Sequence, residues 1–426
     1  MDTVKILKFI GSNKKKILIN FAYLVVAFII LIIQSFYLNS SSMYPDNAEY
    51  YFAPRLLFSP DFSKLYGTVS DWCWFCSRFN TAQFRSLPSL VFFYLPISII
   101  PDFFIAYFIF LVISFVLNIF TVFYCIEIVK HFKNAMPDLK SISYFLSLFL
   151  CSFIQFSSYL QGQLSSLISF LLVNSMYQML KGNERLGCLL VGISFAIKPT
   201  SYFIIIFMII YSRTFKKALT RGFFIVLPNL INIVVFLVYP EMIRGFIYVN
   251  FTHNYYDNGI ALPSISLTSF FTIFFRLANY KVYVLLAVAM PAFISIVLLG
   301  RKKPSIDRIV ISYIFGSMLY FLCQYDVWAS QLVFLLSFMI IFQLIYNDNC
   351  LVEYKGYWFL VIVCFIYDPI RVIYTLFSEN VLIMIIYYCA AAVSTFSILV
   401  LFINSLLFLS RPPGSPRLSR RGSSHA

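Results

Sequence analysis

The sequence predicts an all-α polytopic membrane protein, and its composition and the length of its apolar runs carry that prediction. Of the 426 residues, 61% are hydrophobic and 20% aromatic, and the mean hydropathy is +0.85. Apolar runs repeatedly reach the roughly 20 residues that cross a bilayer as a helix. A β-barrel strand would alternate over about 10 residues, whereas residues 103–123 are apolar on every face.

The apolar runs divide the chain into about twelve predicted membrane segments within one domain, residues 1–410. The first segment is too long for a cleavable signal and has no small-residue cleavage site. The segments are about 17–37, 102–128, 141–160, 164–180, 186–198, 201–212, 219–240, 281–300, 308–323, 331–346, 357–377 and 380–410. Residues 411–426 form a tail rich in Ser, Pro and Arg, which predicts a disordered cytoplasmic end.

The net charge is +15, and the distribution of the positive residues along the chain predicts how the segments are oriented in the membrane. With the N-terminus inside, most of the 32 lysines and arginines fall on the cytoplasmic side, as the positive-inside rule requires. No basic stripe alternates with aromatic residues on a soluble face, so nucleic acid is not a predicted partner. We expect both termini in the cytoplasm and an integral protein of the plasma membrane, or of the endoplasmic reticulum in a eukaryotic host.

Two long external loops follow from this topology, residues 38–101 and 240–280. The first is rich in Tyr, Trp and Phe, the side chains that settle at a membrane interface, which predicts short interfacial helices. Its stretch 87–100 is only about 14 residues long and contains Pro88 and Pro96, so a re-entrant or interfacial segment is expected.

The residues after the first span are the strongest candidates for chemistry. Asp46 is followed by Glu49, Tyr50 and Tyr51 at the mouth of a membrane helix, where stability requires no acid. An alternative remains open, in which Asp46 and Glu49 form an acidic capping box at the start of a helix. Both roles are compatible, with Asp46 as a catalytic base and Glu49 as its capping partner.

Further polar residues mark the tips of the external turns. Gln161 and Gln163 flank one tip and Lys198 stands at the next, between helices of about 12 or 13 residues. Such helices reach only about 20 Å, so the Lys198 tip is expected below the outer surface. Ordinary turn-tip glutamines and an interfacial lysine that snorkels to water are the alternatives. Asp326 and Gln331 lie in a later polar external turn, between the segments 308–323 and 331–346.

The sequence contains no pattern typical of a metal or cofactor site. Cys73 and Cys76 are expected outside the cytoplasm, as a local disulfide or two free thiols, because no second ligand pair follows them. No Asp-x-Asp motif is present. Neither a metal nor a cofactor is therefore predicted.

These motifs together resemble glycosyltransferase family 87, of the C-type glycosyltransferase superfamily, over roughly residues 20–340. The likeness rests on three stretches of the chain. They are Asp46-x-x-x-Tyr50-Tyr51 with Leu65-Tyr66-Gly67; the proline-broken run Phe84–Pro101; and Gln161-Gly162-Gln163 followed by Gly192 and Lys198-Pro199. The family commonly places a His near an aromatic residue in the late external loop. This chain has Tyr325-Asp326-Val327-Trp328 there, so no histidine role carries over.

The resemblance implies an inverting hexosyltransferase that moves a sugar, mannose in the first instance, from a polyprenyl-phosphate donor to a lipid-linked glycan or glycolipid acceptor outside the cytoplasm. It implies that Asp46 is the base and that the donor phosphate is held by Lys198, with Arg85, Arg244 and Arg276 as further candidates. The substrate-binding candidates are Glu49, Tyr50, Tyr51, Gln161, Gln163, Lys198, Asp326 and Gln331.

Two other classes remain open from the sequence. A transporter usually shows paired internal repeats around a midplane site, and no convincing repeat relates the two halves. A polysaccharide polymerase or ligase also has a long external loop, but later in the chain and with prominent arginines. Sugar transfer from a lipid donor in detergent would exclude transport as the sole role.

Overall fold

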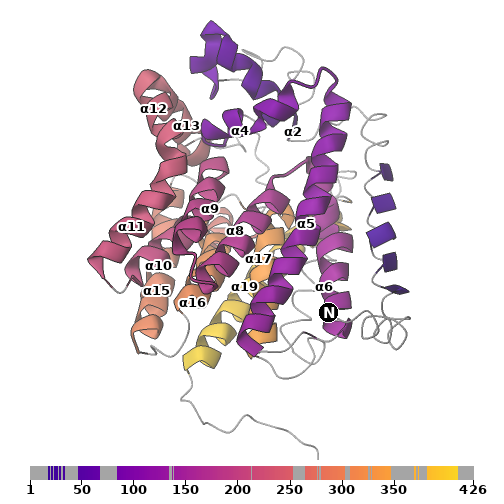
Figure 1. Ribbon diagram of the computed structural model, residues 1–426, viewed down its shortest axis with the longest axis vertical. Coiled ribbons are helices and arrows are strands. Elements are labelled where there is room, and N and C mark those ends of the chain that lie inside the picture. Colours follow the sequence, from indigo (N-terminus) through magenta and orange to yellow (C-terminus); the bar gives the residue numbers. More distant parts are fainter. Residues whose placement is uncertain are drawn as a thin grey trace, which may run out of the picture.

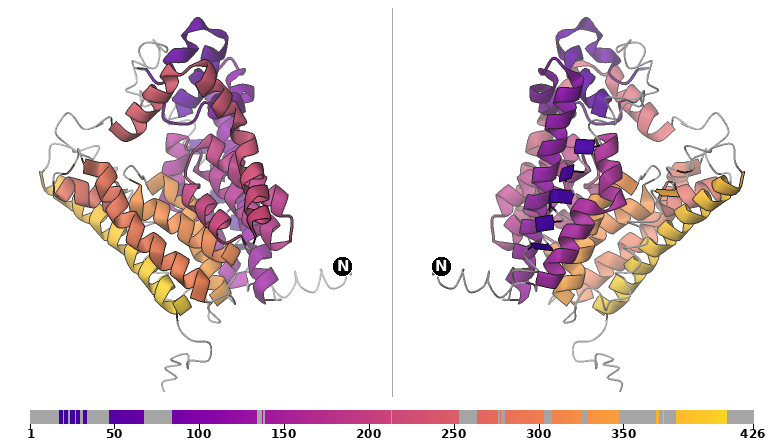
Figure 2. Two further views of the ribbon diagram at one scale, coloured as in Figure 1. Left: turned by 90° about the vertical axis from the view of Figure 1, so that its left-hand side faces the viewer. Right: turned by 90° about the vertical axis from the view of Figure 1, so that its right-hand side faces the viewer.

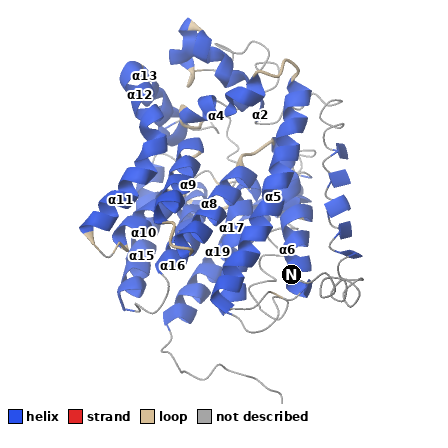
Figure 3. Cartoon of the chain, viewed as in Figure 1, coloured by secondary structure: helices blue, strands red, loops and turns tan. Residues whose placement is uncertain are grey.

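The computed structural model describes residues 47–67, 84–133, 139–212, 214–252, 264–275, 280–302, 308–324, 329–346 and 381–410, with parts of 18–33 and the positions 137, 277, 327, 369, 370 and 373. Within these residues the regular structure is helical (Figures 1 and 3). The predicted tail 411–426, most of the predicted segment 357–377, and Cys73 and Cys76 lie outside them. The all-α prediction is confirmed for the described chain.

The helices follow the chain in this order: α2 (Asn47–Phe52), η1 (Ala53–Phe58), η2 (Pro60–Lys64), α4 (Ser89–Ser98), α5 (Phe103–Lys133), α6 (Leu139–Cys151), α7 (Phe153–Gln161), α8 (Ser165–Leu180), α9 (Glu184–Ile197), α10 (Tyr202–Ile210), α11 (Phe215–Val226), η4 (Leu227–Asn229), α12 (Leu230–Val238), α13 (Glu241–Ile247), η5 (Tyr248–Thr252), α14 (Leu267–Phe274), α15 (Lys281–Lys302), α16 (Arg308–Cys323), η7 (Ala329–Gln331), α17 (Leu332–Tyr346) and α19 (Val381–Ser410).

The helices pack in two groups. In the first, α8 lies against α5 and α9, and α9 lies against α11. In the second, α16 contacts α10, α15, α17 and α19, while α17 also packs on α5 and α8 and so joins the groups. Figure 2 shows α15 and α19 leaning away from α5 toward the end that carries α2. That end holds the candidate site.

Helix α16 forms the centre of the second group. Its residues from Val310 to Cys323 are all buried, which is the property of a helix that is apolar on every face and surrounded by neighbours. The phenol of Tyr313 forms a hydrogen bond with the Ser175 hydroxyl of α8, so this buried polar group is satisfied. The centre of the protein is therefore closely packed rather than polar.

Among the residues that the structure describes, four helices are long and apolar enough to cross a membrane: Phe103–Lys133, Phe215–Val238, Val282–Arg301 and Val381–Leu407. They expose many large apolar side chains, as expected of surfaces that face lipid. The predicted count of about twelve spans is not confirmed, because the other apolar helices are shorter. An α-helix rises about 1.5 Å per residue, so the 16 residues of α8 reach only about 24 Å.

The segment predicted over 141–160 consists of two helices, α6 and α7, with a break between them. Ser152 has extended backbone angles (φ −73°, ψ 154°), and its hydroxyl accepts a hydrogen bond from the backbone N–H of Gln155. Ser152 is thus the N-cap that starts α7, a position that serine favours. The break was missed because the apolar run continues through it.

The segment predicted over 219–240 begins earlier and is interrupted. Thr214 caps α11 by accepting from the N–H of Lys217, so the helix starts at Phe215. Pro228 lies in the short 3-10 turn η4, since proline lacks the N–H that would continue the α-helix. The side chain of Asn229 donates to the carbonyls of Ile225 and Gly192, which ties the break to α9.

Gly192 allows α9 and α11 to approach closely at this break. A Cβ at residue 192 would lie 2.4 Å from the carbonyl oxygen of Ile225. That oxygen belongs to the backbone, so it cannot move aside as a flexible side chain would. A larger residue here would push the two helices apart.

Gly192→Ala is expected to lower the melting temperature by several degrees, because about 1 to 3 kcal/mol is typical of overpacking. Gly222→Ala is the matched control: Gly222 lies in α11, and a Cβ there would have nothing within 4 Å. Its replacement should be neutral or slightly stabilising, as alanine favours the helix. Equal melting temperatures for both variants in detergent would contradict the close-approach argument.

Candidate functional site

The turn between α7 and α8 carries two of the candidate side chains. Gly162 has φ +62°, the left-handed conformation that glycine adopts most readily. Its N–H donates to the carbonyl of Tyr159, and the N–H of Gln163 donates to that of Ser158. This pair of bonds is a Schellman motif, which ends α7 and satisfies its last carbonyls. The turn therefore holds Gln161 and Gln163 on either side of a fixed glycine.

The start of α2 rests directly on this turn. A Cβ at Gly162 would lie 2.4 Å from the Cβ of Asn47 and 2.9 Å from the ring of Tyr107. The Asn47 amide donates to the hydroxyl of Tyr94 at 2.5 Å and to the carbonyl of Gly162 at 3.4 Å. Asn47 is 1% exposed, and its Oδ1 has no hydrogen-bond partner within the described part of the chain. Asn47 thus attaches α2 to both α4 and the Gly162 turn.

Lys198 lies at the adjacent turn, at the end of α9. It has extended backbone angles (φ −150°, ψ 127°), which the following Pro199 favours by disfavouring the helical region. Its ammonium donates to the side-chain carbonyl of Gln163 at 3.4 Å. Gln163 is buried and Lys198 half-buried. The two predicted turn tips therefore meet, although 35 residues separate them.

Helix α2 is buried on several faces and does not present an exposed face to solvent. Glu49, Tyr50 and Tyr51 are each at most 5% exposed. The Tyr51 hydroxyl donates to the carbonyls of Ile100 or Pro101 and accepts from Arg55. Burial raises the pKa of the Tyr51 phenol against the opposing charge of Arg55, which keeps the phenol protonated as a donor. These contacts give Tyr51 a structural role, and a role in substrate binding stays a prediction.

Tyr66 lies near the backbone beside two of the arginine candidates, Arg85 and Arg244. The Tyr66 hydroxyl donates to the carbonyl of Ser86, the neighbour of Arg85. Gly245, the neighbour of Arg244, lies so close to Tyr66 that a Cβ there would approach the Tyr66 Cβ to 2.7 Å. Arg85 is half-buried and Arg244 exposed. The backbone next to Arg85 and the backbone next to Arg244, 159 positions apart by their numbers, therefore both lie near one buried tyrosine.

Gln331 lies in η7, which packs against α7. Its Oε1 accepts a hydrogen bond from the Tyr320 hydroxyl at 3.2 Å, and the Tyr320 ring lies 5.9 Å from that of Tyr202. Tyr202 donates in turn to the side chain of Gln324 at 3.4 Å. Gln331, Tyr320, Tyr202 and Gln324 thus form a set of polar side chains between the end of α16 and the start of α10. Tyr202, the first residue of α10, comes four residues after Lys198 in the sequence.

Three predicted site residues, Asp46, Asp326 and Arg276, lie outside the described residues. Of the others, Gln163 and Lys198 are in direct contact, while the chain neighbours of Arg85 and Arg244, Ser86 and Gly245, lie at Tyr66. Gln161 is half-buried beside Gly162. Within the described part of the chain, no three His, Cys, Asp or Glu side chains gather closely enough to hold a metal ion.

Sequence reasoning missed Asn47 and Tyr94. Both are buried and bonded to one another at the junction of α2, α4 and the Gly162 turn. The available signal was the position of Asn47, directly after Asp46. Tyr94 carries no signal of its own within an apolar run, because tyrosine is common in such runs throughout this chain.

Gly162→Ala is expected to lower the melting temperature more than Gly182→Ala. Both glycines have positive φ, so both variants carry the backbone strain of about 1 to 2 kcal/mol. Only residue 162 adds a clash with Asn47 and Tyr107, since nothing lies within 4 Å at residue 182. Thermal melting in detergent measures the difference. Identical losses for the two variants would show that α2 does not rest on the turn.

A comparison of the sequence with known protein families identifies the family of this chain. No curated protein matches the chain. The model of glycosyltransferase family 87 matches residues 88–324, more than half of the 426 residues. The match includes the Gly162 turn and Lys198, begins after Asp46 and Asn47, and ends before Gln331. The chain is a membrane-associated, all-helical member of glycosyltransferase family 87, and hence a glycosyltransferase.

Proposed function

We propose that this protein transfers a sugar, in the first instance mannose, from a polyprenyl-phosphate donor to a lipid-linked glycan or glycolipid acceptor on the extracytoplasmic face. Family membership supports glycosyl transfer, and the contact between Lys198 and Gln163 carries the more specific proposal. It brings a cation to the turn on which Asn47 rests, and Asn47 directly follows Asp46 in the sequence.

The reaction needs one base and one cation. Asp46 accepts the proton of an acceptor hydroxyl, whose oxygen attacks the anomeric carbon from the side opposite the phosphate. The new C–O bond forms as the bond to the phosphate oxygen breaks, and the electron pair leaves with the polyprenyl phosphate. The configuration inverts, so a β-linked donor gives an α-linked product. A phosphate leaves readily as an anion and needs no general acid.

Lys198 is the group best placed to stabilise the departing phosphate. Its ammonium is half-buried, and a charge acts more strongly in a partly desolvated site than in water. Gln163 accepts one of its three N–H donors and so fixes its direction. Arg85 and Arg244, whose neighbours Ser86 and Gly245 lie at Tyr66, are candidates for the second contact with the phosphate.

The placement of charge among the described residues supports an extracytoplasmic site. The ends of α5, α8 and α15 and the starts of α9, α11 and α16 carry Lys130, Lys133, Lys181, Arg185, Lys216, Lys217, Arg221, Arg301 and Arg308. The Gly162 turn precedes α8 and Lys198 follows α9, so both lie at the ends of these two helices opposite Lys181 and Arg185. An excess of Lys and Arg marks the cytoplasmic side.

Transport and polysaccharide polymerisation or ligation are the competing functions. Purified protein in detergent, given a labelled polyprenyl-phosphate sugar and a glycolipid acceptor, separates them. Transfer of one sugar supports the proposal. Uptake by vesicles without transfer would favour a transporter, and long products from repeated addition would favour a polymerase.

Asp46→Asn is expected to reduce kcat by about 100- to 10,000-fold, the usual contribution of a general base. The melting temperature should stay near that of the wild type. Asp61→Asn is the control, because Asp61 forms an exposed ion pair with Lys64 in η2, and it should keep full activity. A joint loss of folding and activity in Asp46→Asn would instead assign Asp46 to helix capping.

Lys198→Ala is expected to lower kcat/KM for the polyprenyl-phosphate donor by roughly 10- to 100-fold, since hydrogen bonds to charged groups contribute about 1.5 to 3 kcal/mol. Lys130→Ala removes an equivalent charge from the exposed pair with Glu127 and should leave donor kinetics unchanged. Initial rates at varied donor concentration measure both. Wild-type donor kinetics in Lys198→Ala would remove this lysine from the site.

A further inference from the structure

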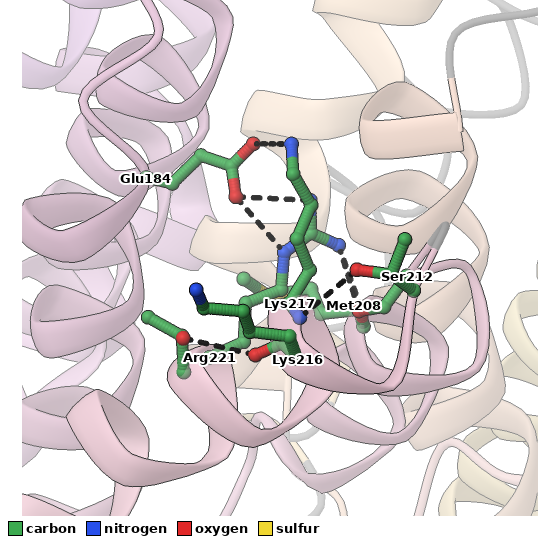
Figure 4. Close-up of polar contacts among 8 residues, drawn as sticks. Glu184, Met208, Ser212, Lys216, Lys217 and Arg221 are labelled. Atoms are coloured by element: carbon green, nitrogen blue, oxygen red, sulfur yellow. Dashed lines mark hydrogen bonds and ion pairs between the residues drawn. The ribbon is translucent and has the colours of Figure 1, made fainter.

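A second charged centre lies at the end of α9 opposite Lys198 (Figure 4). Glu184 at the start of α9 forms ion pairs with Lys217 at 3.2 Å and Arg221 at 3.4 Å, both from α11. Partial burial alone would raise the pKa of the Glu184 carboxyl, but the charges of Arg221 and Lys217 hold it below its usual value. The carboxylate is therefore ionised and fully engaged by cations.

Arg221 holds three helices together at this centre. It donates to the carbonyl of Met208 at 2.8 Å and to the hydroxyl of Ser212, at the end of α10, as well as to Glu184 (Figure 4). The last carbonyls of a helix lack partners within it, so this contact completes α10. The side chain is 11% exposed. Arg221 is thus committed to structure and has little surface to offer a ligand.

Three exposed cations surround this centre without an acid partner in the described part of the chain: Lys181, Arg185 and Lys216. The Lys181 ammonium lies 5.6 Å from the ring centre of Tyr177, and the Arg185 guanidinium 5.9 Å from that of Phe224. Both distances are within the range of a cation–π interaction, which favours these positions of the two charged groups. With the half-exposed Lys217, they form a surface that we term the basic surface: Lys181, Arg185, Lys216 and Lys217.

An apolar stripe begins beside the basic surface on α11. Phe215, Leu219, Phe223 and Val226 recur at the spacing of one helix face and are 84%, 65%, 60% and 46% exposed. They start the candidate membrane span Phe215–Val238. A ligand that covers both surfaces needs a negative group and an apolar tail. A soluble acidic protein would neutralise the cations but leave the stripe uncovered.

We propose that the basic surface binds the headgroup phosphate of anionic phospholipids while the acyl chains lie along the α11 stripe. Clustered cations at the cytoplasmic end of a span attract such headgroups, and the attraction is short-ranged in salt. The 14 residues of α9 separate this surface from Lys198 by about 20 Å. The lipid site is thus distinct from the proposed donor site and does not depend on the reaction.

Native mass spectrometry of the full chain in neutral detergent tests the proposal, with titrations of phosphatidylglycerol and phosphatidylcholine. The wild type should bind phosphatidylglycerol at least tenfold more tightly. Arg185→Gln combined with Lys216→Gln should weaken that binding about 25-fold, because about 1 kcal/mol per cation corresponds to about fivefold each. Lys64→Gln, which removes one positive charge from an exposed lysine of η2, should bind as the wild type.

Equal affinity for the two lipids would overturn the proposal, as would unchanged phosphatidylglycerol binding in the double variant. Preferential binding of a soluble acidic peptide would also overturn it and assign the surface to a protein partner. Glu184 and Arg221 are untouched, so the double variant should keep its melting temperature. If it melts earlier, the charge-preserving pair Arg185→Lys and Lys216→Arg decides: wild-type lipid binding there supports the proposal, and its loss overturns it.

Discussion

The contact between Asn47 and the Gly162 turn is the interaction on which the rest of the site depends. Only a residue without a side chain both adopts φ +62° without strain and leaves space for the Asn47 Cβ. The contact joins α2 to a turn more than a hundred residues away, and Gln163 in that turn accepts from Lys198. The stretch that contains Asn47, the Gly162 turn and Lys198 are each weak signals in the sequence, and these contacts bring them together in the structure.

Breaks in the helices position this arrangement, and side chains satisfy the backbone at two of them. Ser152 caps α7, and Asn229 bonds the carbonyls left near Pro228. Inside a membrane protein an irregular backbone persists only where the protein itself supplies the missing hydrogen bonds. Ser152 and Asn229 therefore lie where helices are interrupted, because their side chains supply hydrogen bonds that the helix backbone lacks there.

The two ends of helix α9 carry different polar contacts. At one end Lys198 meets Gln163, and at the other Glu184 meets Arg221 and Lys217. Gly192 lies between them and lets α11 pack closely enough for the ion pairs to form at one end of the helix pair. A single short helix thus fixes the spacing between the proposed reaction site and the proposed lipid surface.

The sequence by itself determined that the chain is helical and apolar and where most helices end, because hydropathy and the residues Pro, Gly, Ser and Thr act locally. It also singled out Gln163 and Lys198, since each stands at a polar turn between apolar runs. Only the tertiary structure decided that these two side chains meet, that Asn47 rests on Gly162, and that Ser86 and Gly245, the neighbours of Arg85 and Arg244, both lie at Tyr66. Such contacts depend on how helices distant in the chain pack, and no local pattern encodes that packing.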